Sequence, residues 1–151
     1  MKLQIYSLRK EFEEHPERMK RIHEITLDKT RPMLGFKGRY GLLGSELWWD
    51  NVDSGKLRMG SREGLIIDHI YTGMNDDDMK PNTILCKDKN NLEWKMEMYP
   101  TDQLKVADIF KIGNRVTEIY VLDRTKLDKI PFLVPDYAEV IIEVWVEIMN
   151  A

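Results

Sequence analysis

The sequence has a single cysteine, Cys86, so it cannot form an internal disulfide. Proteins without disulfides are typical of reducing compartments. Nothing in the chain approaches the roughly 20 consecutive apolar residues that span a bilayer. The first residues, Met1–Tyr6, are followed by charged residues rather than by the apolar stretch of a signal peptide. We therefore expect a soluble, cytoplasmic protein with no membrane partner.

Motifs for metal, nucleotide and nucleophile chemistry are also missing. The three histidines, His15, His23 and His69, lack the i, i+4 spacing of a zinc-binding helix, and no Cys-x-x-Cys pair accompanies them. The glycines between residues 35 and 44 lack the Gly-Lys-Ser/Thr ending of a phosphate-binding loop. Residues 75–78, Asn-Asp-Asp-Asp, offer oxygen ligands but do not fit the EF-hand template. We predict no cofactor and no metal, and the balance favours a protein without catalytic activity.

The composition is that of one globular domain over residues 1–151, with 42% hydrophobic and 32% charged residues. The net charge of −3 argues against a general nucleic-acid binder, but the charge is uneven. Residues 1–39 hold 10 Lys and Arg against 6 Asp and Glu, and the remainder holds 13 against 20. Such a basic N-terminal third marks either a partner surface or an ordinary solvated helix face.

Hydrophobic patterning predicts an α+β fold dominated by antiparallel β-structure. Residues 2–8 alternate as a strand does, and a helix is expected from His15 or Pro16 to a point before Pro32. Turn residues then separate short apolar runs, which predict strands at residues 45–50, 56–59, 65–71, 83–87, 92–99, 115–122 and 137–149. Residues 106–112 fit a strand or a short helix. About eight strands indicate a bent sheet or small barrel, with one N-terminal helix packed on it.

The last of these strands, residues 137–149, is apolar on both faces. A strand of this kind lies inside a sheet for most of its length. An apolar surface left uncovered there would also suit a homodimer, which we keep as a possible assembly.

The aromatic residues supply the leading functional hypothesis. Trp48 and Trp49 are adjacent in an expected strand, so one should face the core and the other the opposite surface. An outward tryptophan beside basic side chains is a good anchor for a partner. We predict a non-catalytic binding domain, possibly of the immunity or phage-inhibitor type, that recognises a protein or a small anionic ligand through a β-face. The predicted binding residues are Tyr40, Trp48, Trp49, Arg58 and Arg62.

Two alternatives remain open beside this hypothesis. A small-barrel nucleic-acid binder would use basic side chains, namely Arg18, Lys20, Arg21, Lys37 and Arg39. A hydrolase would use His69 or His23 with a distant carboxylate, because Asp68 and His69 are neighbours in a strand and point to opposite faces. The purely structural interpretation is that both tryptophans cover the core and that Cys86 is a small core residue.

Overall fold

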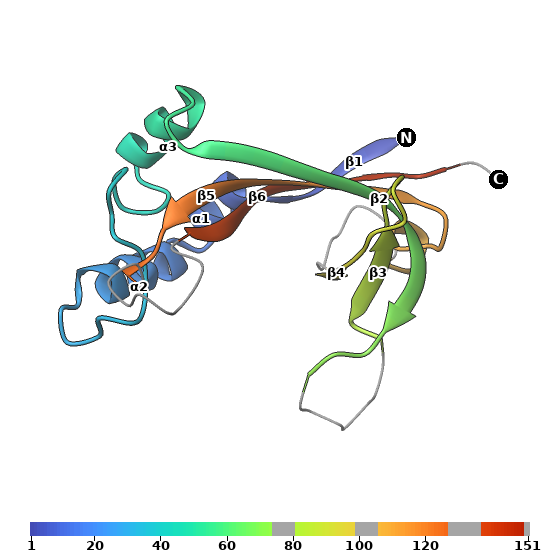
Figure 1. The fold of residues 1–151 in the computed structure, drawn as a ribbon, viewed down its shortest axis with the longest axis horizontal. Coiled ribbons are helices and arrows are strands. Elements are labelled where there is room, and N and C mark those ends of the chain that lie inside the picture. Colours follow the sequence, from blue (N-terminus) through green and yellow to red (C-terminus); the bar gives the residue numbers. More distant parts are fainter. Residues whose placement is uncertain (74–80, 99–105, 127–136, 150–151) are drawn as a thin grey trace. The chain divides into compact units, whose positions relative to one another are not determined.

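The computed structural model describes residues 1–73, 81–98, 106–126 and 137–149, and it has an α+β fold (Figure 1). Its strands form one antiparallel sheet in the order β1-β6-β5-β2-β3-β4. The strands are β1 (Lys2–Ser7), β2 (Arg58–Ile70), β3 (Thr83–Lys87), β4 (Glu93–Glu97), β5 (Arg115–Arg124) and β6 (Tyr137–Glu147). The helices are α1 (Leu8–Glu14), α2 (Pro16–Leu27), α3 (Glu46–Asp53) and α4 (Val106–Ile109).

The predicted fold class is confirmed, with two corrections. The described residues contain six strands rather than about eight, and the strand order leaves β1 and β4 at opposite edges of an open sheet, so the barrel alternative is wrong. None of the helices in the described part of the chain is long and apolar enough to cross a membrane.

The chain divides into two compact units. Unit 1 comprises Met1–Tyr6, Ser61–Glu118 and Glu143–Ala151, and unit 2 comprises Ser7–Gly60 and Ile119–Ile142. Strands β1, β2, β5 and β6 each contribute residues to both units. A single domain over residues 1–151 therefore stays a prediction.

Unit 1 is built on the pairing of β2, β3 and β4. The β3–β4 hairpin pairs Thr83 with Glu97 and Cys86 with Trp94, and its strands lie where strands are predicted, within residues 83–87 and 92–99. The core of this unit consists of fully or almost fully buried apolar side chains, namely Ile66, Ile84, Cys86, Ile109, Phe110, Val116, Val144 and Val146. The buried amide of Asn114 donates to the carbonyls of Asp108 and Ile109 at the end of α4 and accepts from the backbone N–H of Met149. This side chain satisfies a helix end, as buried helix termini require.

Unit 2 carries three helices, and the sequence provides a serine cap or a proline at the start of each. Ser7 caps α1 by accepting from the backbone N–H of Lys10, and Ser45 caps α3 by accepting from that of Trp48. Pro16 stands in the first turn of α2, where proline costs no hydrogen bond. Gly44 has a positive φ of 79°, and a Cβ there would lie 2.5 Å from the ring of Phe12. Only glycine fits so close to α1 in this conformation.

Two expectations about local structure are wrong. Residues 45–50 form the start of α3, not a strand, because the serine cap and the acidic first turn outweigh the β-propensity of the tryptophans. Residues 60–64 are not a turn but part of the long strand β2. Both glycines there allow close packing: a Cβ on Gly60 would lie 2.5 Å from the Tyr120 ring, and one on Gly64 would lie 2.9 Å from the carbonyl oxygen of Lys87.

The remaining elements follow the sequence more closely. α2 begins at Pro16 as predicted, but a separate helix, α1, precedes it and was not expected. α4 resolves the open choice for residues 106–112 in favour of a short helix. β6 lies between β1 and β5 with every second residue from Val140 to Val146 buried, which confirms an internal strand. A homodimer through this strand stays a prediction.

Candidate functional site

The outer side of α3 brings acidic, apolar and aromatic side chains together on one surface of unit 2. Trp48, Asn51 and Val52 face inward, so the remaining residues of the helix lie on its solvent side. There, acidic side chains stand between an exposed leucine and a half-buried tryptophan. We call this surface the α3 face: Glu46, Leu47, Trp49, Asp50 and Asp53.

Arg9 of α1 is tied to the α3 face by two interactions. Its guanidinium carbon lies 3.9 Å from the centroid of the Trp49 ring, which is cation–π geometry. The same guanidinium donates two hydrogen bonds of 3.2 Å to the Asp53 carboxylate. Because the ring and the carboxylate fix the arginine from two sides, the Trp49 surface is held in one arrangement before any partner arrives.

The predicted binding residues are distributed over both units. Trp49 is half-buried on the α3 face, and Arg58 is exposed at the start of β2. Tyr40 is half-buried, and its carbonyl accepts from the side chain of Asn51 at 2.9 Å. Trp48 is fully buried on the inner side of α3, and Trp49 lies on its outer side. Both tryptophans belong to this helix, so the expectation that they stand in a strand and on a β-face is wrong.

Arg62 belongs to unit 1, whereas the other four predicted residues belong to unit 2. It lies 3.6 Å from the carboxylate of Glu118 and stacks over the ring of Trp94 at 5.9 Å. It also lines a pocket of about 560 Å³ in that unit with Lys87, Lys89 and Arg115 among the other lining residues. The guanidinium of Arg62 is therefore engaged within its own unit.

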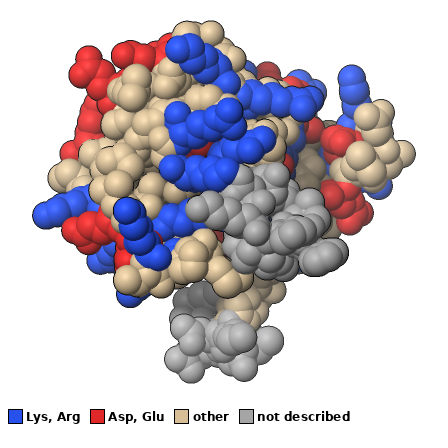
Figure 2. All heavy atoms as spheres, turned by 60° about the vertical axis from the view of Figure 1, so that its left-hand side comes forward, with Lys and Arg blue, Asp and Glu red and all other residues tan. Residues whose placement is uncertain are grey.

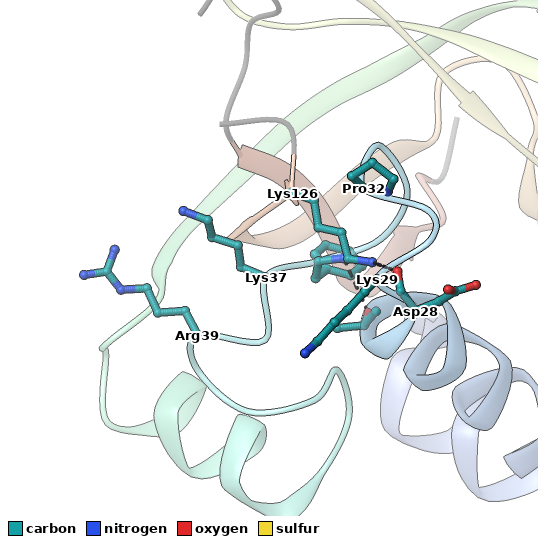
Figure 3. A pocket seen from close by; sticks show the side chains of 8 residues that line it. Asp28, Lys29, Pro32, Lys37, Arg39 and Lys126 are labelled. Atoms are coloured by element: carbon teal, nitrogen blue, oxygen red, sulfur yellow. Dashed lines mark hydrogen bonds between the residues drawn. The ribbon is translucent and has the colours of Figure 1, made fainter. Parts of the chain in front are cut away.

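A basic pocket lies at the C-terminal end of α2, also in unit 2 (Figure 3). Its volume is about 660 Å³. The lining, here named the α2 pocket, comprises Thr26, Asp28, Lys29, Pro32, Phe36, Lys37, Arg39 and Lys126. Figure 3 shows Lys37 and Arg39 extending in the same direction from the loop, while Lys29 leaves the end of α2. Figure 2, turned toward the helices, shows Lys and Arg side chains gathered across the middle of this face.

Lys126 and Asp28 play structural parts in this pocket. The Lys126 ammonium donates to the carbonyls of Ile25, Asp28 and Arg31 at 2.7, 3.0 and 3.3 Å, so it caps the end of α2. The Asp28 carboxylate accepts from the hydroxyl and the backbone N–H of Thr30. These two hydrogen bonds hold the pKa of Asp28 below its usual value. The pocket's one described carboxylate is thus occupied by its own loop.

Comparison with known protein families gives the family of this chain. Residues 1–147 match the family described as immunity protein RhsI2. The chain belongs to the RhsI2 immunity protein family. No curated protein matches the sequence. Membership implies a protein partner, a cognate Rhs toxin.

In this RhsI2 family member, both histidines considered for hydrolysis are bonded to backbone carbonyls. Nε2 of His23 lies 2.7 Å from the oxygen of Leu43, and Nε2 of His69 contacts the oxygen of Phe110. Among the residues that the structure describes, neither ring pairs with a carboxylate. These histidines therefore join loops and strands, and the geometry offers the hydrolase alternative no support.

The thiol of this immunity-family protein is equally unsuited to chemistry. Cys86 is fully buried in β3, and its burial, together with the nearby Glu118, raises the pKa of the thiol to about 12. Within the described ranges, no three His, Cys, Asp or Glu side chains are grouped so as to hold a metal ion. The acidic run at residues 75–78 lies outside the described residues.

Sequence reasoning missed Arg9, Asp53, Lys29 and Lys126. A signal existed for Asp53 alone, because a helix over residues 46–53 would have placed Trp49 and Asp53 at i, i+4 on one face. Spacing along the sequence could not reveal Lys126, because it lies about 100 positions from the end of α2 that it contacts.

Proposed function

We propose that this chain binds a cognate Rhs toxin and neutralises it by direct association, without catalysis. The observation that carries the proposal is the family match over residues 1–147. The buried Cys86 and the carbonyl-bonded His23 and His69 support a binding role, because the groups most suited to catalysis are held in structural contacts. The cytoplasm, which the sequence favours, is part of this proposal as the compartment of action.

The α3 face with Arg9 is the surface that we propose for toxin contact. Tryptophan and arginine are the residues most often found as binding hot spots, and here they are stacked at 3.9 Å. Their arrangement is fixed by Asp53, which lowers the entropy lost on association. Tyr40 and Arg58 of the same unit are included in the proposal as flanking contacts. Trp48 supports this surface from below and does not reach a partner.

Arg62 enters the proposal only as a contact contributed by unit 1. Its guanidinium lies over the Trp94 ring, and the residue lines a polar pocket. An Arg62→Ala change tests this contribution by itself, because toxin affinity should fall without any change in the α3 face.

The test combines toxin neutralisation with a matched pair of variants. A cognate Rhs toxin domain is co-expressed with this chain, and growth and affinity are measured. We expect the wild-type chain to restore growth, and Trp49→Ala to weaken toxin binding by about 2 kcal/mol or more if Trp49 is a hot spot. Trp145→Ala is the control, because Trp145 is also a half-buried tryptophan near a cation, Lys2 at 5.7 Å, but lies in unit 1.

Failure of the wild-type chain to bind or neutralise the toxin overturns the proposed function itself. A different result, neutralisation by the wild type with equal effects of Trp49→Ala and Trp145→Ala, keeps the function and removes the α3 face as its site. Circular dichroism and thermal unfolding of each variant separate loss of binding from loss of fold.

A further inference from the structure

We propose that the α2 pocket receives an acidic segment of the toxin, with Lys29 and Arg39 pairing with its carboxylates. This inference rests on the proposed function and names the chemistry of one part of the interface. Both cations are exposed, and neither makes an ion pair with a described residue. A pocket with a surplus of uncompensated positive charge favours a negatively charged occupant.

The carboxylate inside the pocket does not cancel this charge. Oδ1 of Asp28 accepts both hydrogen bonds from Thr30, and Oδ2 lies 3.5 Å from Nε of Arg31. Asp28 is therefore satisfied by its own loop, and it leaves Lys29 and Arg39 available to a partner.

The loop that forms the pocket wall is held in place before binding. Lys126 bonds carbonyls at the end of α2 and at Arg31, and the backbone N–H of Lys37 donates to the carbonyl of Arg124 at 2.9 Å. Phe36 pairs with Thr125 as an isolated antiparallel bridge. A wall fixed on both sides loses little conformational freedom when a partner docks, so more of the interaction energy appears as affinity.

The apolar part of the wall favours a polypeptide over a nucleic acid. Pro32 and Phe36 line the pocket, and large apolar side chains of the same loop region are exposed: Leu27 by 65%, Met33 by 50% and Leu34 by 53%. Exposed apolar side chains bordered by polar ones are typical of a protein-binding surface. An acidic segment that also carries apolar side chains matches both features.

The experiment reverses the two cations and compares an equal change elsewhere on α2. The test variant is Lys29→Glu with Arg39→Glu. The control is Lys20→Glu with Arg21→Glu, since both residues are exposed on α2, lie outside the pocket and make no ion pair with a described residue. The two variants have the same net charge, so a difference between them reports position and not overall electrostatics.

Affinity for the cognate toxin domain is measured for each protein at low and high salt. We expect the pocket variant to lose about tenfold or more in affinity, with a weaker salt dependence than the wild type, and the control to change much less. Equal losses in the two variants overturn the pocket proposal while leaving neutralisation by the wild type intact. Failure of the wild type to bind overturns the proposed function instead.

A single-stranded oligonucleotide serves as the competing probe. Tight oligonucleotide binding that is lost in the pocket variant, with unchanged toxin affinity, would assign the pocket to nucleic acid and overturn the proposal. Weak oligonucleotide binding that is equal in both variants supports the acidic-segment assignment.

Discussion

The indole Nε1 of Trp48 donates a hydrogen bond of 3.0 Å to Oδ2 of Asp123, and both side chains are fully buried in unit 2. The contact joins α3 to β5 across 75 positions of the sequence. Burial raises the pKa of Asp123, although the hydrogen bonds from Trp48 and from the backbone N–H of Arg124 oppose this rise. α3 is therefore anchored through a polar contact beneath the surface that carries Trp49.

Removing the acceptor should destabilise the fold more than neutralising it. Asp123→Ala leaves the buried indole N–H without a partner, which costs about 1–3 kcal/mol in the free energy of unfolding. Asp123→Asn keeps an amide oxygen for that N–H and removes the buried charge, so its loss should be smaller. Urea unfolding at pH 7 measures both variants. If the two variants lose the same free energy of unfolding, the Trp48 hydrogen bond makes no specific contribution to stability.

The raised pKa of Asp123 gives a pH dependence of defined sign. The folded protein binds this proton more tightly than the unfolded chain, whose aspartate titrates near 3.8. The cost of the buried charge is fully present above the folded pKa and is relieved as the pH falls toward 3.8. The wild type should therefore gain stability relative to Asp123→Asn as the pH falls through this window. A difference in free energy of unfolding that stays constant from neutral pH to pH 4 would contradict this.

Gly44 and Gly55 form a matched pair for testing close packing. Both have a φ of 79°, but a Cβ on Gly44 would lie 2.5 Å from the Phe12 ring, whereas nothing lies within 4 Å of one on Gly55. Alanine at either position should cost about 1–2 kcal/mol for the left-handed backbone alone. Gly44→Ala should lose further stability because Phe12 must move. Thermal unfolding compares the two, and equal shifts in Tm would mean that Phe12 yields without cost.

The sequence predicts the elements whose signals are local. The hairpin of β3 and β4 and the internal strand β6 follow from alternation, turn residues and apolar character on both faces. Two adjacent tryptophans favour β-structure, so the pattern of residues 45–50 predicts a strand, and that prediction takes no account of the Ser45 cap that starts α3.

What the sequence could not supply depends on contacts between distant segments. The sequence around Gly60 predicts a turn, but in the structure this glycine lies in a strand and makes room for the Tyr120 ring. The α2 pocket depends on Lys126 reaching the end of α2, and the stacking of Arg9 on Trp49 depends on the packing of α1 beside α3. Such pairs have no signature in spacing, so the sequence can nominate aromatic and arginine residues as candidates but cannot give the geometry that brings Arg9 and Trp49 together.

Lys126 links the stability of unit 2 to the shape of the α2 pocket. Lys126→Met keeps much of the apolar stem but removes the ammonium that caps the carbonyls of Ile25, Asp28 and Arg31. We expect a loss of about 1–2 kcal/mol in the free energy of unfolding, from the lost charged hydrogen bonds at the end of α2. Toxin affinity should fall as well, since the loop carrying Lys29 would lose the contact that orders it.

The comparison with Lys126→Arg distinguishes loop order from charge alone. Arginine keeps the positive charge, but its planar fork cannot reproduce the point contact of an ammonium with converging carbonyls. If pocket shape determines toxin affinity, both variants should weaken binding. If only the positive charge matters, Lys126→Arg should bind as the wild type does while Lys126→Met does not. Calorimetric titration with the toxin domain, performed at a temperature where each variant is folded, measures this difference.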